Sequence, residues 1–149
     1  MNRSEKILVW LLRASGVVML VALGAVVMPF EWMNLVHQKL GLGKLPGAPI
    51  VDYLTRSASA LYAVHGALLI FAASDVRRYL PLVRFLAWVA VAFGPVMIVV
   101  DHTAGMPLLW TASEGPSIIA IGVVFLWFAR RVQTQQPTEH GERHQNSVE

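Results

Sequence analysis

Four long apolar runs follow one another along the chain, separated by shorter polar stretches. They cover, in order, about residues 7–28, 50–74, 82–103 and 115–130. An apolar helix needs roughly 20 residues to cross the hydrocarbon core of a bilayer, and each run approaches or exceeds that length. The pattern therefore predicts an all-α integral membrane four-helix bundle that forms one domain, residues 1–131. The polar residues 132–149 are expected to form a disordered cytoplasmic tail.

The first apolar run has a second interpretation, as a signal peptide cleaved near Ala22-Leu23-Gly24. Arg13 would interrupt the apolar core of such a peptide, and the run continues past the cleavage site, which favours a spanning helix. Arg13 and Gly16 share one helical stripe. The guanidinium is expected either to face the bundle or to extend along the helix toward the headgroups.

Between the first two runs, apolar residues recur with helical spacing from Phe30 to Leu40, and Trp32 lies among them. This pattern predicts a short helix in the membrane interface. Before the fourth run, Thr111 and Glu114 have the spacing of a capping box and Pro116 suits a first helical turn, so the fourth span is expected to begin there and to be short. Ala87 and Gly94 in the third run indicate close helix packing.

The chain is 56% hydrophobic and 14% charged, whereas a soluble domain has about 25% charged residues. Its Lys and Arg residues gather at the amino terminus, in the loop 75–84 and at Arg130-Arg131, while the other two loops hold only Lys39 and Lys44. The positive-inside rule then predicts a protein of the cell inner (plasma) membrane with both termini in the cytoplasm. The net charge of +3 is explained by this topology, so no nucleic-acid partner is expected.

The orientation places a set of polar residues close to the outer surface. They are Glu31, His37, Asp52, Arg56, Asp101, His102 and Glu114, with Tyr62 and His65 deeper on the second run. Ionisable groups inside a membrane normally pair with one another, so Arg56 is expected to have a partner among Asp52, Asp101 and Glu114.

Three hypotheses remain open for this candidate binding cluster. The charges pair and stabilise the bundle; or they form a ligand, proton or ion pathway; or they form an enzyme centre with a metal, a haem or a quinone. The chain has no cysteine, which excludes disulfides, thiolate nucleophiles and iron–sulfur ligation. His65 lies roughly 20 Å below the outer end of its helix and His102 near that end, so the two cannot ligate one haem. No catalytic residue, metal or cofactor is predicted.

The arrangement of four short spans, with Arg13-Ala14-Ser15-Gly16 opening the first, resembles the DoxX-like group of small bacterial membrane proteins. The resemblance implies an accessory membrane protein. The loop from Phe30 to Pro49 and the segments Asp101-His102 and Glu114-Gly115-Pro116 have no counterpart in that pattern.

The expected function is therefore non-catalytic: an accessory protein of the lipid bilayer that binds a membrane-protein partner, a second copy of itself or a small ligand. The alternative is a small transporter or a proton- or ion-conducting protein that uses the outer polar cluster.

Overall fold

The computed structural model describes residues 1–133, and its regular elements over that range are all helices. Four helical segments are long and apolar enough to cross a membrane, which confirms the all-α class and indicates a membrane protein. Residues 134–149, most of the predicted tail, lie outside the described part. The helices are, in order, α1 (Arg3–Leu20), α2 (Leu23–Val27), α3 (Phe30–Lys39), α4 (Pro49–Ala72), α5 (Leu80–Thr103) and α6 (Leu108–Gln133).

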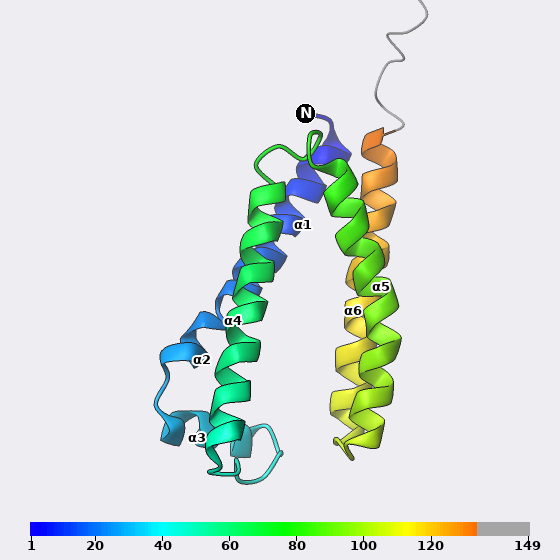
Figure 1. Cartoon of the computed structure of the whole chain (residues 1–149). Helices are drawn as coiled ribbons and strands as arrows, with labels where there is room; N and C mark the ends of the chain where they lie inside the picture. The colour runs from blue at the N-terminus through cyan, green and yellow to red at the C-terminus, as the bar shows by residue number, and fades with distance from the viewer. Residues whose placement is uncertain (134–149) are drawn as a thin grey trace, which may run out of the picture.

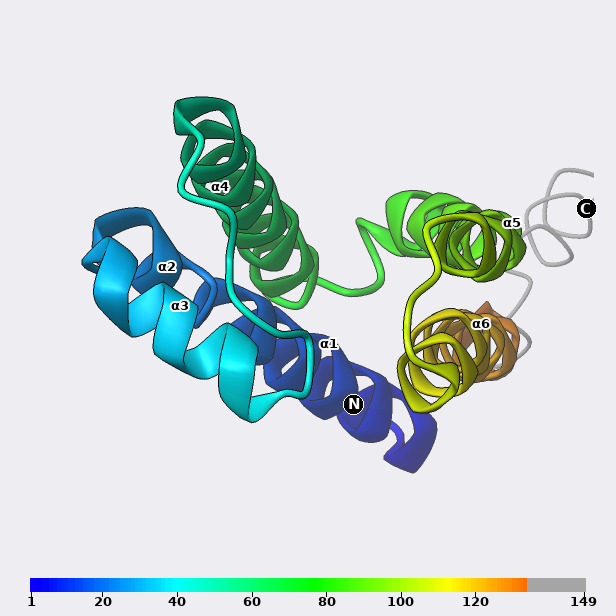
Figure 2. The same ribbon diagram turned by 90° about the horizontal axis from the view of Figure 1, so that it is seen from below.

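The long helices form two pairs. In the first helix pair α1 and α2 pack along α4, and in the second helix pair α5 packs along α6. The two pairs meet beside the 73–79 connection and diverge from there, as an inverted V in Figure 1. Seen from below, they stand apart at their far ends (Figure 2). The bundle therefore has a narrow end, beside residues 73–79, and a wide end, beside α3.

Glycine explains why the helices associate in these pairs. A Cβ atom added at Gly16 of α1 would lie 2.7 Å from the carbonyl oxygen of Gly66 in α4. A Cβ at Gly94 of α5 would lie 2.8 Å from the carbonyl oxygen of Gly115 in α6. Because only glycine permits such close backbone approach, each pair is held by dispersion contacts along a glycine crossing. The packing role predicted for Gly94 agrees with this contact.

The buried core lies at the narrow end, where all four long helices and the 73–79 connection contribute to it. An ion pair covers it: the Arg77 Nη2 atom lies 3.0 Å from Oε2 of Glu5, whose residue is only 5% exposed. The hydrogen bond to Glu5 also raises the pKa of Arg77. The core residues are Leu8, Leu12, Leu69, Ala72, Ala73, Val76, Leu80, Val83, Ala87, Phe125, Leu126, Ala129 and Val132.

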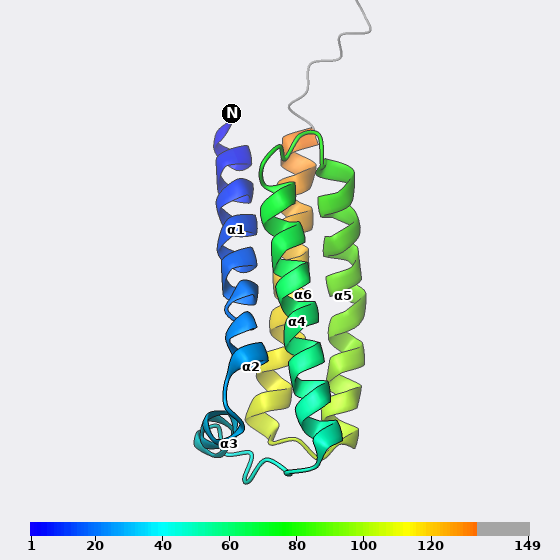
Figure 3. The same cartoon turned by 60° about the vertical axis from the view of Figure 1, so that its left-hand side comes forward.

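The short helix predicted after the first run is α3, which lies across the direction of the long helices (Figure 3). Met33 is its buried residue, while Trp32 and Leu35 are exposed. The following loop folds back on α3, because the amide of Leu45 donates to the Asn34 side chain at 2.9 Å. α3 therefore presents apolar side chains outward at the wide end.

The start of the fourth long helix differs from the prediction. α6 begins at Leu108, because the Pro107 carbonyl accepts hydrogen bonds from the amides of Trp110 at 2.9 Å and Thr111 at 3.2 Å. Thr111 and Glu114 therefore lie inside the helix and do not cap it. Pro116 is also internal. The span is longer than expected, since a proline inside a helix removes one hydrogen bond without ending the helix here.

The first span also differs in detail. The helix is interrupted at Val21 and Ala22, between α1 and α2. The buried stripe of α1 consists of Glu5, Leu8, Leu12 and Gly16, whereas Arg13 is exposed. Of the two orientations expected for Arg13, the one that faces the bundle is wrong, because the Leu12–Gly16 face packs on α4 and α6 and turns Arg13 outward.

Candidate functional site

The polar residues expected to gather near the outer surface are divided between the two helix pairs. Asp52 and Arg56 belong to α4 in the first pair, while Asp101 and Glu114 belong to α5 and α6 in the second. These positions lie toward the wide end, where the pairs diverge (Figures 1 and 2). Within residues 1–133, Arg56 forms an ion pair with Asp52 and none with Asp101 or Glu114, so one of its three predicted partners is confirmed.

Arg56 makes the contacts that sequence analysis anticipated, and others that it did not. Its Nε atom lies 3.0 Å from a carboxylate oxygen of Asp52, one helical turn earlier, as predicted. Its two terminal nitrogens donate to the carbonyl oxygens of Val26 and, at 3.1 Å, Met28. The last carbonyl groups of a helix have no partner within that helix, so Arg56 caps the carboxyl end of α2.

Two of the predicted site residues, Glu31 and His37, belong to α3. Glu31 is exposed. The Nδ1 atom of His37 lies 2.9 Å from the carbonyl oxygen of Gly43 and donates to it, which closes the loop after α3. The three-residue metal cluster that a site with His37 and His102 would need is not found in residues 1–133.

In the second pair, His102 is exposed and Glu114 accepts a hydrogen bond from the indole nitrogen of Trp110. Asp101 is different: it is 4% exposed, and its Oδ2 atom has no hydrogen-bond partner within the described range. A buried polar atom without a partner lowers stability by about 1–3 kcal/mol. Asp101 is thus a locally unfavourable residue in the contact between α5 and α6.

Replacing Asp101 by leucine, which has the same number of side-chain heavy atoms but no polar group, should therefore stabilise the protein. We expect Asp101→Leu to raise the free energy of unfolding by about 1–3 kcal/mol, measured by thermal unfolding in detergent micelles. Val100→Leu, at the exposed neighbouring position, is the control and should change little. A lower unfolding temperature for Asp101→Leu would contradict the expectation and show that the carboxylate has a stabilising partner.

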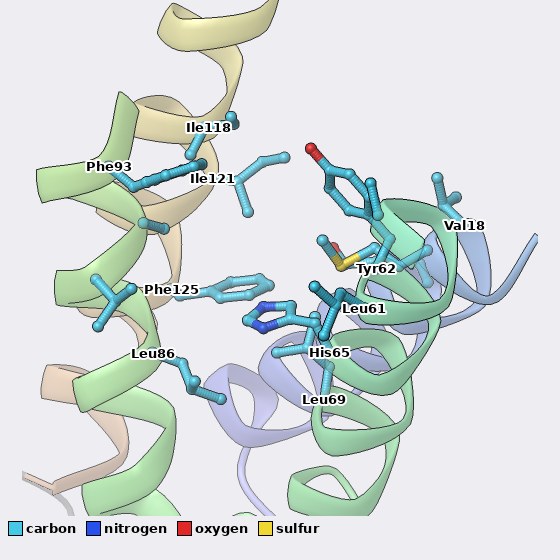
Figure 4. Close-up of a pocket in the computed structure, with 16 residues that line it drawn as sticks. Val18, Leu61, Tyr62, His65, Leu69, Leu86, Phe93, Ile118, Ile121 and Phe125 are labelled. Carbon is cyan, nitrogen blue, oxygen red and sulfur yellow. The ribbon is translucent and has the colours of Figure 1, made fainter. Parts of the chain in front are cut away.

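Between the helix pairs lies an apolar cleft of about 710 Å³, hereafter the cleft. All four long helices line it, and its closed end adjoins the core at Leu69 and Phe125. Figure 4 shows the side chains of α4 facing those of α5 and α6 across it. Its lining residues are Ala14, Ser15, Val18, Met19, Ala58, Leu61, Tyr62, His65, Leu69, Leu86, Val89, Ala90, Phe93, Ile118, Ile121 and Phe125.

Two polar side chains project from α4 into this apolar space. The imidazole of His65 points toward Phe125, and the ring of Tyr62 stands one helical turn farther toward the wide end (Figure 4). Neither side chain has a hydrogen-bond partner among residues 1–133. No Lys, Arg, Asp or Glu lines the cleft. The hydroxyl-bearing Ser15 of α1 also lines the cleft. The cleft therefore combines largely apolar walls with a few hydrogen-bonding groups, which is the usual composition of a small-molecule site.

Sequence analysis identified Tyr62 and His65 but placed them with the outer charges. The structure separates them from Arg56, which is satisfied by Asp52 and α2. The opposing wall, with Phe93 and Ile118, was missed, because its side chains have the composition of any lipid-facing helix. The ion pair of Glu5 and Arg77 was missed as well, since the two residues lie far apart in the sequence.

The fold and the cleft define a class: an all-helical protein with four candidate membrane spans and an apolar cleft between two helix pairs. Comparisons of the chain with protein-family models, with curated proteins and with solved structures found no match.

Proposed function

We propose that this is a multi-pass protein of the cell inner membrane that binds a membrane-soluble small molecule in the cleft and does not catalyse a reaction. The observation that carries the proposal is the pair of unpartnered polar side chains of α4, His65 and Tyr62, inside a cleft whose other lining residues are apolar except for Ser15. The accessory role implied by the resemblance to the DoxX-like group is part of the same proposal.

The size and position of the cleft support a ligand. Its volume of about 710 Å³ lies within the roughly 300–1,000 Å³ typical of small-molecule sites. His65 is 16 residues from the start of α4 at Pro49, so it lies about 24 Å along a helix of about 36 Å. In a bilayer this depth falls in the hydrocarbon core, where the candidate ligands are molecules dissolved in the membrane.

The side chains of the cleft favour binding over catalysis. General acid–base or nucleophilic chemistry needs a second group that orients or activates the first. His65 has no such partner in the described structure, and no carboxylate, lysine or arginine lines the cleft.

The proposal is tested by filling the cleft. Ala90 of α5 lines it, whereas Ala92 of the same helix is exposed and does not. Ala90→Phe should remove a ligand that co-purifies with the protein, while Ala92→Phe should retain it. The measurement is mass spectrometry of solvent extracts from protein purified in mild detergent, expressed per mole of folded protein. If all three proteins carry the same lipids in the same amounts, the proposed function is wrong.

The proposed orientation places the 73–79 connection in the cytoplasm and α3 at the outer surface. Because the chain has no cysteine, single cysteines report the side directly. We expect Gln38→Cys and Ala104→Cys to react with a membrane-impermeant maleimide on intact cells, and Ser74→Cys to react only after permeabilisation. All three positions are exposed in the protein. The opposite labelling pattern would invert the proposed topology.

A further inference from the structure

We infer that the molecule bound in the cleft is uncharged and carries one oxygen-containing head group, such as the hydroxyl of a long-chain alcohol, which bonds to His65 or Tyr62. This inference rests on the proposed function and specifies the chemical class of its ligand. Three features of the cleft carry it: the placement of the two polar groups of α4, the composition of its walls and the absence of charged residues from its lining.

His65 and Tyr62 offer hydrogen-bonding partners to a small head group at two neighbouring depths of the cleft. They are three residues apart on α4, and residues with this spacing are neighbours on a helix surface, about 5–6 Å apart at Cβ. Both side chains project into the same cleft (Figure 4). A hydroxyl group is both a donor and an acceptor, as is a phenol, and a neutral imidazole has one nitrogen of each kind. The imidazole of His65 is turned toward Phe125, and the Tyr62 hydroxyl lies at the tip of its ring, farther toward the wide end (Figure 4). A ligand hydroxyl can therefore bond to either residue.

The walls suit a hydrocarbon body. The side of the cleft opposite α4 is formed by aliphatic and aromatic side chains, including Leu86, Phe93 and Ile121. α4 and α5 diverge from the 73–79 connection onward (Figure 1), and the residues of α4 that line the cleft extend over several helical turns, from Leu69 to Ala58. An alkyl or isoprenoid chain can lie along these walls while its head reaches α4.

The absence of charge argues against anionic lipids. No cationic side chain lines the cleft. The arginine of α4, Arg56, bonds to Asp52 and to carbonyl groups at the end of α2. A carboxylate or phosphate in the cleft would have no counter-ion and would lose its hydration. A plain hydrocarbon would leave both polar groups unpaired. A site that hydrogen-bonds a hydroxyl discriminates against analogues that lack it, so we expect a preference of about tenfold or more for the alcohol.

Photo-crosslinking tests this with three probes that share one diazirine-bearing alkyl chain. Their heads are a hydroxyl, a carboxylate and a methyl group. The protein is reconstituted in phosphatidylcholine nanodiscs, and labelled residues are mapped by mass spectrometry. We expect the alcohol to label the cleft residues about tenfold more than either of the others. Tyr62→Phe, which removes only a hydroxyl, and His65→Leu should each reduce the preference, while His102→Leu, an exposed histidine outside the cleft, should preserve it.

The outcomes separate this inference from the proposed function. If no probe labels the cleft, both are wrong. If the three probes label it equally, or the carboxylate probe labels it most, the cleft binds ligands but the inference about their head group is wrong. If the alcohol is preferred and both α4 variants keep that preference, the assignment to His65 and Tyr62 is wrong. Tyr62→Phe is the decisive variant, because a half-exposed side chain that loses one oxygen leaves the fold intact.

Discussion

Gly94→Ala is expected to destabilise the protein by about 1–3 kcal/mol, although alanine is the better helix former. An added Cβ would contact the Ile119 side chain and lie 2.8 Å from the backbone oxygen of Gly115, which cannot move without separating α5 from α6. Gly115→Ala should have the same effect, because its Cβ would lie 2.8 Å from the oxygen of Gly94. The measurement is the unfolding temperature in detergent micelles, together with the yield of monodisperse protein.

Gly24→Ala provides the matched control for this prediction. Gly24 lies in α2, and nothing within 4 Å would meet an added Cβ. The same substitution should therefore be neutral or stabilise by up to about 1 kcal/mol through helix propensity. A similar loss of stability for Gly24→Ala and Gly94→Ala would show that backbone flexibility, and not close helix contact, explains the effect.

The helices were predictable from sequence because each is specified locally. An apolar run of sufficient length predicts a span whatever it packs against, and the spacing of Met33 and Val36 predicts a short helix without knowledge of its neighbours. The contact of Arg56 with Asp52 was predictable for the same reason, since it joins residues one turn apart. The predicted start of α6 was wrong because two segments could begin the helix, the capping pattern at Thr111 and the turn at Pro107. The Pro107 carbonyl accepts the first hydrogen bonds of the helix, so α6 begins there.

The arrangement of the helices was not predictable in this way. In a soluble protein, apolar side chains mark the core. In a protein that spans a membrane, residues facing lipid, a helix partner or a cleft are all apolar. Phe93 lines the cleft and Val96 of the same helix does not, yet their chemistry gives no reason to separate them. Small residues were a signal for close contact, but Gly16 does not specify that its partner is Gly66.

This difference explains where the cleft lies. The glycine crossings give each helix a close partner, α1 with α4 and α5 with α6, and the side chains of the core join the two pairs only at the narrow end. Away from that end, no glycine crossing joins one pair to the other within the described chain. The bulky side chains of Leu61, Phe93 and Ile121 therefore line the cleft and do not pack against one another. The polar groups of α4 remain open there.

Arg56→Gln is expected to lower the free energy of unfolding by about 2–3 kcal/mol, because hydrogen bonds to a charged group contribute about 1.5–3 kcal/mol each and only part of this is recovered by solvent or glutamine. The substitution removes contacts to Asp52, Val26 and Met28 at once. Asp52→Asn should have a smaller effect, since the guanidinium keeps both carbonyl groups. The measurement is thermal unfolding of each variant in detergent.

The local consequence should appear in α2. When Arg56 is replaced, the carbonyl groups at the end of Leu23–Val27 lose their partner, so the amides of α2 should exchange with deuterium faster while those of α6 are unchanged. Arg56→Lys keeps the charge but lacks the planar guanidinium that reaches two carbonyls and a carboxylate together. In this variant the amides of α2 should therefore exchange almost as fast as in Arg56→Gln. If Asp52→Asn destabilises the protein as much as Arg56→Gln and α2 exchange does not change in either, Arg56 contributes through the carboxylate alone and does not cap α2.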